Sequence, residues 1–359
     1  MKIQVTKTFL PPLDEYITYL ERIWASGWIT NNGELVQELE NKLADYLDVP
    51  YIQFVSNGTI ALQLALRALE IQGEVITTPF SYVATTNTIL WEHCKPIFVD
   101  IDERTLCLDP NKIEAAVTDK TQAILAVHVY GYPCDVEAIQ TIAAKYDLKV
   151  IYDGAHAFGC KYKKESLLNY GDISTLSFHA TKLFHTVEGG AVIVHSKDMA
   201  EKIWLLKSFG HIGEKHFIVG INGKNSELHA AMGLCMLNHI DQIIKDRKKV
   251  FQFYDKFLNE MKPPVAKQIP GSDHNFSYYP ILFESEAWLL AAIQALNSRE
   301  IYPRRYFYPP LNKMPFLSPT SMPVAEDISS RILCLPMQPD LSEEIVKMIC
   351  DTILQSSSS

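Results

Sequence analysis

Short apolar runs alternate with helix-like segments through the first part of the chain. Segment 60–69 has the apolar face of a helix, and 136–146 is a second helical segment. The runs that have the length of a buried strand are 74–77, 95–99, 123–129, 149–152, 174–178 and 191–195. This alternation is typical of a mostly parallel sheet covered by helices, because parallel strands need long crossover connections.

The pattern changes near residue 238. A long charged helix is predicted over 240–261, and Lys262-Pro263-Pro264 follows it. Further on come a tyrosine-rich strand over 276–283 and helices over 286–298 and 342–354. We therefore expect a large sheet domain over 1–238 and a smaller C-terminal α/β domain over 239–359.

Composition limits the function classes. The 359 residues are 47% hydrophobic and 21% charged, enough for a substantial core. A formal net charge of −9 argues against nucleic-acid binding, which needs clustered Lys and Arg. The 7 cysteines form no C-x-x-C pair, which favours packed thiols in a reducing compartment over disulfides or a metal site.

No membrane span or secretion signal is expected. No apolar stretch approaches the roughly 20 residues that cross a bilayer. Residues Met1 to Leu20 are interrupted by Pro11, Pro12 and Asp14 where a signal would need an apolar core. We expect a cytoplasmic protein.

Lys182 and Asp153 carry the chemistry. Lys182 stands between the apolar run 174–178 and the turn Glu188-Gly189-Gly190, and Asp153 directly follows another apolar run. A pyridoxal phosphate enzyme needs such a pair: the lysine forms a Schiff base, and the carboxylate keeps the pyridine nitrogen protonated. The alternatives are a solvated surface lysine and an Asp at a helix N-cap.

The segments Ser177-Phe178-His179-Ala180-Thr181-Lys182 and Tyr152-Asp153-Gly154-Ala155-His156 resemble the DegT/DnrJ/EryC1/StrS family of sugar-nucleotide aminotransferases. The resemblance extends over most of the chain. It implies a fold-type-I α/β enzyme that binds pyridoxal phosphate and forms a homodimer. It also implies that Lys182 is the Schiff-base lysine and, once freed, the general base.

The same resemblance implies the cofactor contacts. Gly58, Thr59 and Ser177 would bind the phosphate, Tyr82 would stack on the pyridine ring, and His156 would lie near the phenolic oxygen. The turn Ser56-Asn57-Gly58-Thr59 precedes a helix, and a helix N-terminus attracts anions. Packing in the core is the alternative for Tyr82.

One segment is expected to act across a dimer. Asn222 lies in a stretch that, in relatives, contacts the phosphate in the neighbouring subunit. Many relatives have an aromatic residue and Arg next, whereas this chain has Gly223 and Lys224. Lys224 is either a contact for the nucleotide diphosphate or a solvated loop lysine.

Two further segments resemble substrate-reading loops of the family. One contains Trp28 and Thr30, and the other contains Arg304, Arg305 and Tyr308, whose arginines would neutralise a diphosphate. Interdomain packing is the alternative for the aromatic residues. His179 is a further candidate for contact with the sugar.

The predicted activity is transfer of an amino group from L-glutamate to a dTDP-linked keto-deoxysugar. Glu188 before Gly189-Gly190 resembles family members that act at C4, so dTDP-4-keto-6-deoxy-D-glucose is the expected substrate, for O-antigen or another surface polysaccharide. Three alternatives stay open. They are an enzyme acting at C3, a sugar dehydratase, whose relatives have His in place of this lysine, and a regulatory protein that keeps the fold without catalysis.

Overall fold

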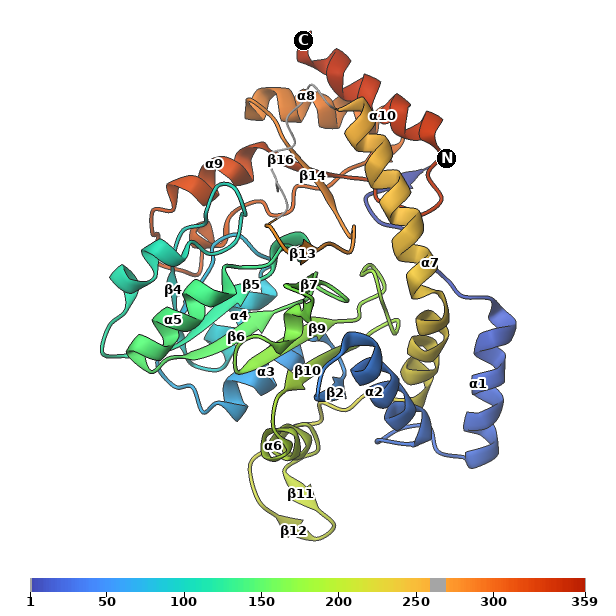
Figure 1. Cartoon of the computed structure of the whole chain (residues 1–359), viewed down its shortest axis with the longest axis vertical. Helices are drawn as coiled ribbons and strands as arrows, with labels where there is room; N and C mark the ends of the chain where they lie inside the picture. Colours follow the sequence, from blue (N-terminus) through green and yellow to red (C-terminus); the bar gives the residue numbers. More distant parts are fainter. Residues whose placement is uncertain (1, 259–268, 359) are drawn as a thin grey trace.

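A computed structural model describes residues 2–258 and 269–358. Within them, a seven-stranded sheet has the order β2-β10-β9-β6-β5-β3-β4 (Figure 1). Strand β10 is antiparallel to both neighbours, whereas β9, β6, β5, β3 and β4 run parallel. The strands are β2 (Tyr51–Val55), β3 (Glu74–Thr77), β4 (Lys95–Phe98), β5 (Thr121–Val127), β6 (Lys149–Asp153), β9 (Ile173–Ser177) and β10 (Gly190–Val194). The predicted large, mostly parallel sheet is confirmed.

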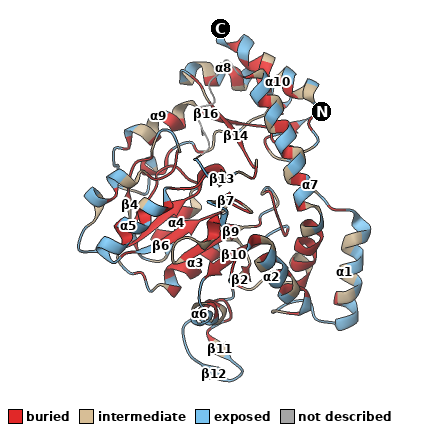
Figure 2. Ribbon diagram, in the orientation of Figure 1, coloured by how far each residue is buried: buried red, intermediate tan, exposed pale blue. Residues whose placement is uncertain are grey.

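Helices bury both faces of this sheet (Figure 2). Ile151 on β6 belongs to the core beneath α3 (Gly58–Ala68) and α6 (Lys197–Lys207), while its neighbours Val150 and Tyr152 belong to the core beneath α5 (Val136–Tyr146). Successive strand residues point to opposite faces, so strands covered on both sides are apolar throughout. This explains the uninterrupted apolar runs in the sequence.

A second core lies in the C-terminal part of the chain. Strands β14 (Tyr279–Leu282) and β16 (Ile332–Leu335) form an antiparallel pair, and β1 (Ile3–Gln4) runs parallel to β15 (Ile301–Tyr302). The helices that contribute to this core are α7 (Glu227–Phe257), α8 (Glu286–Asn297) and α10 (Glu343–Gln355). The N-terminal strand therefore packs with the C-terminal region.

The long helix differs from its prediction. Helix α7 begins at Glu227, not at 240, and runs without a break past residue 238. Residues 230–236 of this helix are all buried, so they lack the polar face by which an amphipathic helix is recognised. Residues 259–261 of the predicted helix, and Lys262-Pro263-Pro264, lie outside the described residues. The division of domains at 238 stays a prediction.

Among the helices that were not predicted are α1 (Leu13–Ser26) and α2 (Glu34–Leu47). Both pack on α7, and α1 forms an outer layer at the edge of the molecule (Figure 1). Short strands complete the fold: β7 (Lys161–Tyr162), β8 (Glu165–Ser166), β11 (His211–Ile212), β12 (Lys215–His216) and β13 (Ser272–Asp273). No helix in the described part of the chain is long and apolar enough to cross a membrane.

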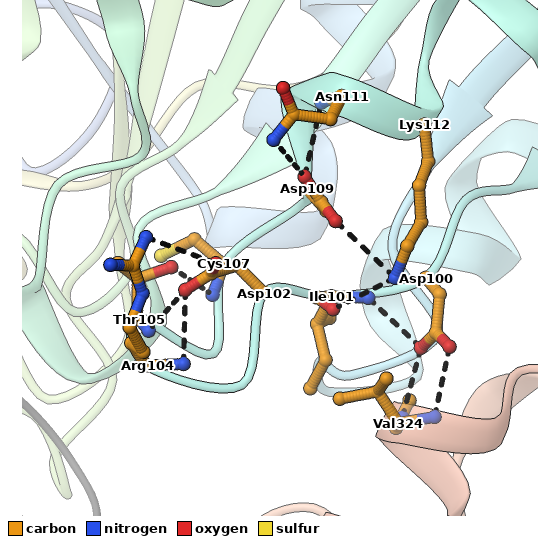
Figure 3. A network of polar contacts seen from close by, with 11 residues as sticks. Asp100, Ile101, Asp102, Arg104, Thr105, Cys107, Asp109, Asn111, Lys112 and Val324 are labelled. Carbon is orange, nitrogen blue, oxygen red and sulfur yellow. Dashed lines mark hydrogen bonds and ion pairs between the residues drawn. The ribbon is translucent and has the colours of Figure 1, made fainter.

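Asp100 ties the C-terminal region to the sheet (Figure 3). Its carboxylate, just beyond β4, accepts hydrogen bonds from the backbone N–H groups of Val324 and Ala325, both at 2.9 Å, in the first turn of α9 (Pro323–Arg331). A carboxylate at a helix N-terminus satisfies free N–H groups and complements the helix dipole. A further bond, from Leu311 N–H to the Pro79 carbonyl at 2.8 Å, holds the segment that follows Tyr308 against the sheet domain.

Candidate active site

A cavity of about 390 Å³ opens at the carboxyl ends of β5, β6 and β9. Ligand sites of open α/β sheets lie at this edge, where the strands end and the loops begin. The structure brings ten of the predicted site residues to its lining: Gly58, Thr59, Tyr82, Asp153, His156, Ser177, His179, Lys182, Glu188 and Arg304. The segments that carry them are far apart in the sequence, and the sheet brings them together.

Lys182 lies in the loop between β9 and β10. Two backbone hydrogen bonds close this loop, from Phe178 N–H to the Gly189 carbonyl at 2.7 Å and from Thr186 N–H to the Phe178 carbonyl at 2.9 Å. Burial lowers the pKa of the Lys182 amine to about 8, and the Asp153 carboxylate opposes that shift. A lysine with such a pKa has far more neutral amine near neutral pH than an ordinary lysine has.

Asp153 ends β6 and is 7% exposed. Its two oxygens accept hydrogen bonds from Ala155 N–H at 3.0 Å and from the Thr85 hydroxyl at 2.9 Å. Ser81 lies 2.8 Å from the same hydroxyl. Burial raises the pKa of Asp153, and the two donors and the Lys182 charge oppose the shift. The sequence interpretation missed Thr85 and Ser81, although both lie within three residues of Tyr82.

His156 has a defined tautomer. The backbone N–H of Tyr130 donates to its Nδ1 at 3.1 Å, so Nδ1 is an acceptor and the neutral ring carries its proton on Nε2. Burial lowers the pKa of His156 well below its ordinary value, and the nearby charge of Lys182 lowers it further. The ring is parallel to that of Phe307, with centroids 5.8 Å apart. His156 thus offers a neutral N–H donor to the cavity.

The turn before α3 has the geometry that suits an anion. Asn57 caps the helix by accepting from Ile60 N–H at 2.9 Å, and the first-turn N–H groups of Gly58 and Thr59 face the cavity edge. The backbone approach is close, since a Cβ on Gly58 would lie 2.9 Å from Cβ of Ser177. A Cβ on Gly190 would lie 2.5 Å from the Asn57 carbonyl carbon. Only glycine fits at both positions without a shift of the neighbours.

These groups fit pyridoxal phosphate. The cavity offers an amine for its aldehyde, a carboxylate for its ring nitrogen and a helix N-terminus for its phosphate. The Tyr82 side chain is 62% exposed in the chain and lines the cavity, which leaves its ring free for stacking. No cluster of three His, Cys, Asp or Glu side chains suited to a metal ion occurs in residues 2–258 and 269–358.

Of the six predicted residues that lie away from this cavity, four are Trp28, Thr30, Asn222 and Lys224. Trp28 Nε1 donates to the Asn31 carbonyl at 3.4 Å, and Thr30 is exposed in the same loop. Asn222 forms a backbone bridge with Ser208. The Lys224 amine lies 4.4 Å from the centroid of the Phe209 ring. None of these four predicted residues lines the cavity of its own chain.

The structure also separates the two neighbouring arginines. Arg305 donates to Glu286 at 2.7 Å and to the Ser330 carbonyl at 2.8 Å, and its guanidinium lies 3.5 Å from the centroid of the exposed Tyr308 ring. Arg304, its neighbour, lines the cavity instead. Adjacent residues of an extended segment point in opposite directions, so only one of the pair can reach the site. The cavity lining also contains three aromatic residues, Tyr278, Tyr306 and Phe307.

Several known proteins resemble this chain in sequence and in fold. A dTDP-4-amino-4,6-dideoxy-D-glucose transaminase of Shigella dysenteriae is 48% identical over 98% of both chains. The crystal structure of DesI in the presence of its TDP-sugar product matches with a TM-score of 0.93 and 28% identity, covering 99% of this chain and 93% of that one. The pyridoxal phosphate (PLP) form of the sugar aminotransferase Spr1654 from Streptococcus pneumoniae matches with a TM-score of 0.92 and 26% identity. This match covers 100% of this chain and 99% of that one.

The DegT/DnrJ/EryC1/StrS aminotransferase family model matches residues 13–354, nearly the whole chain. This agrees with the lysine, the carboxylate and the anion site that surround the cavity. The resemblance seen in the sequence is therefore confirmed, and the chain belongs to the DegT/DnrJ/EryC1/StrS aminotransferase family.

Proposed function

We propose that this protein transfers the amino group of L-glutamate to C4 of dTDP-4-keto-6-deoxy-D-glucose, with pyridoxal phosphate as cofactor. One observation carries the proposal: the Lys182 amine and the Asp153 carboxylate line one cavity beside the N-terminus of α3. The name of the 48% identical relative supports the nucleotide sugar and the C4 position. The product would serve surface polysaccharide synthesis, and the buried free thiols fit a cytoplasmic enzyme.

Each protein group has a distinct task. When bound, pyridoxal phosphate supplies an aldehyde that links to amines and a ring that withdraws electrons from the substrate carbon. Lys182, with its pKa near 8, accepts the proton from the substrate carbon and returns it. Asp153 would accept a hydrogen bond from the protonated ring nitrogen, and Thr85 and Ala155 orient its carboxylate. His156 would donate a hydrogen bond from its Nε2–H group to the phenolic oxygen of the cofactor.

The sugar end of the site contains His179 and Glu188, whose Nε2 and Oε1 atoms lie 3.6 Å apart. Both side chains can hydrogen-bond sugar hydroxyls. Glu188 is the residue on which the choice of C4 over C3 was based. Amination at C3 is the alternative within the same chemistry, because a small change in sugar orientation would exchange the reacting carbon.

We propose a homodimer with shared active sites. Trp28, Thr30, Asn222 and Lys224 lie off the cavity of their own chain, so a second copy would have to bring them to it. The arm that includes β11, β12 and the residues up to Asn222 also exposes large apolar side chains, as a surface covered by a partner would. These are Phe209, Ile212, Phe217, Val219 and Ile221.

The function is tested with purified holoenzyme and L-glutamate alone. We expect the absorbance of the bound cofactor to change to that of its amine form, and borohydride reduction before glutamate addition to attach the cofactor to the peptide that contains Lys182. Lys182→Ala should lose both signals, while Lys224→Ala should keep the attached peptide. An unchanged spectrum in the wild type, or labelling of another lysine, contradicts the proposal.

A further inference from the structure

Among the described residues, the lining of the cavity contains one cation that the proposed chemistry does not use. Lys182 and Arg304 are the Lys and Arg side chains on it, and Asp153 and Glu188 are its carboxylates. Lys182 acts on the cofactor and the substrate carbon. Asp153 is held by Thr85 and Ala155, and Glu188 faces His179. Arg304 therefore remains without an assigned task.

Arg304 has a fixed backbone and a free side chain. Its N–H donates to the Cys334 carbonyl at 3.1 Å, and Cys334 N–H donates back to the Arg304 carbonyl at 2.8 Å, which fastens the segment to β16. Within residues 2–258 and 269–358, no carboxylate pairs with its guanidinium, in contrast to Arg305, which pairs with Glu286. A charged side chain anchored in this way and left unpaired at a cavity is suited to an anionic ligand.

Two anions enter the site in the proposed function, on which this inference rests. The α-carboxylate of glutamate is bonded to the carbon whose amine reacts, so it must lie inside the cavity beside Lys182. The diphosphate of the sugar nucleotide is attached at C1, across the sugar ring from the reacting C4, and so lies farther from Lys182. Arg304 shares the cavity with Lys182, which favours the carboxylate.

We propose that Arg304 binds the α-carboxylate of the amino donor and takes no part in holding the nucleotide. The planar guanidinium matches a carboxylate with two parallel N–H···O hydrogen bonds. Arg305 is turned away to Glu286, whereas Tyr306 and Phe307, which follow it in the chain, line the same cavity as Arg304. The keto sugar, which has no carboxylate, leaves Arg304 in water during the second half of the reaction.

The test measures binding of two probes to holoenzyme by calorimetry. α-Methyl-L-glutamate has no proton on its reacting carbon and reports donor binding without turnover, and dTDP reports the nucleotide site. We expect Arg304→Gln to raise the Kd of α-methyl-L-glutamate about 10- to 100-fold, the usual effect of losing a charge-assisted hydrogen bond, and to leave the Kd of dTDP unchanged. Arg304→Lys keeps the positive charge but loses the two parallel N–H donors of the guanidinium. It should therefore raise the Kd of α-methyl-L-glutamate by a smaller factor.

Arg331→Gln is the matched control, because Arg331 pairs with Asp327 on α9 and does not line the cavity. A rise in the Kd of dTDP with Arg304→Gln, alone or together with the donor, overturns the assignment, as does a loss of donor binding in Arg305→Gln but not in Arg304→Gln. Wild-type holoenzyme that binds dTDP but not α-methyl-L-glutamate refutes the proposed donor, and the role of Arg304 with it. Wild-type binding combined with unaltered binding by Arg304→Gln refutes the role of Arg304 alone.

Discussion

The Asp153 carboxylate depends on one hydroxyl that its own strand does not supply. Thr85, in the first turn of α4 (Ala84–Trp91), donates to it at 2.9 Å, whereas the buried Thr86 hydroxyl beside it has no partner in the described part of the chain. Two neighbouring threonines thus share a backbone setting and differ in this one contact. Substituting each threonine in turn therefore distinguishes an effect on the orientation of Asp153 from an effect on packing.

Thr85→Val should lower kcat by about 10-fold, because Asp153 loses a hydrogen bond of the charged kind, whose removal costs roughly 1.5–3 kcal/mol. Thr86→Val removes a hydroxyl without a partner and should leave kcat within about twofold, since the isosteric methyl fills the same space. Steady-state kinetics of the two variants check this. Equal losses in both would show that the Thr85 contact does not orient Asp153.

The pKa of Lys182 predicts how the apoprotein takes up its cofactor. The neutral amine is the nucleophile, and a pKa lowered to about 8 means that ammonium predominates below pH 8 and neutral amine above it. The rate of pyridoxal phosphate uptake should therefore rise with pH through a midpoint near 8. Asp153→Asn should move the midpoint lower, because the carboxylate favours the ammonium form. A midpoint near the ordinary lysine value of 10.5 would refute the prediction.

At the scale of elements, the ends of strands were the most predictable part of the site. Asp153 directly follows the predicted run 149–152, and Ser177 lies one residue before the end of the predicted run 174–178; the structure ends β6 and β9 at these two residues. Helix α7 was harder, because its first turns are buried and lack a polar face. The choice between Arg304 and Arg305 depended on the direction of a short extended segment, which neither composition nor periodicity specifies.

Gly58→Ala tests the approach of α3 to β9. The added Cβ would lie 2.9 Å from Cβ of Ser177, so the turn must move and the Kd of pyridoxal phosphate should rise, by about 10-fold if one hydrogen bond to phosphate is lost. Gly27→Ala is the control, because a Cβ added at Gly27 would meet no other residue within 4 Å. Only the φ of +64° disfavours a side chain at that position. Gly27→Ala should cost about 1 kcal/mol of stability and leave the Kd unchanged. Equal Kd values in both variants would contradict the proposed phosphate site at the N-terminus of α3.

At the scale of the whole molecule, shared sites make a distinctive prediction for mixed dimers. If Asn222 serves the partner's cofactor, a dimer of one Lys182→Ala chain and one Asn222→Ala chain has one site with both changes and one site with neither. Random mixing should then restore about a quarter of wild-type activity, since half of the dimers are mixed and each has one intact site. No recovery would show that Asn222 acts in its own chain or not at all.

The regiochemistry of the product tests the central claim most directly. Holoenzyme should be incubated with L-glutamate and, separately, with the C4-keto and C3-keto forms of the dTDP-6-deoxysugar, and each product examined by NMR. The account predicts a new amine on C4 from the first substrate, no product from the second, and one 2-oxoglutarate released for each amino sugar formed. Amination at C3 alone, or no transfer from glutamate to either sugar, would contradict it.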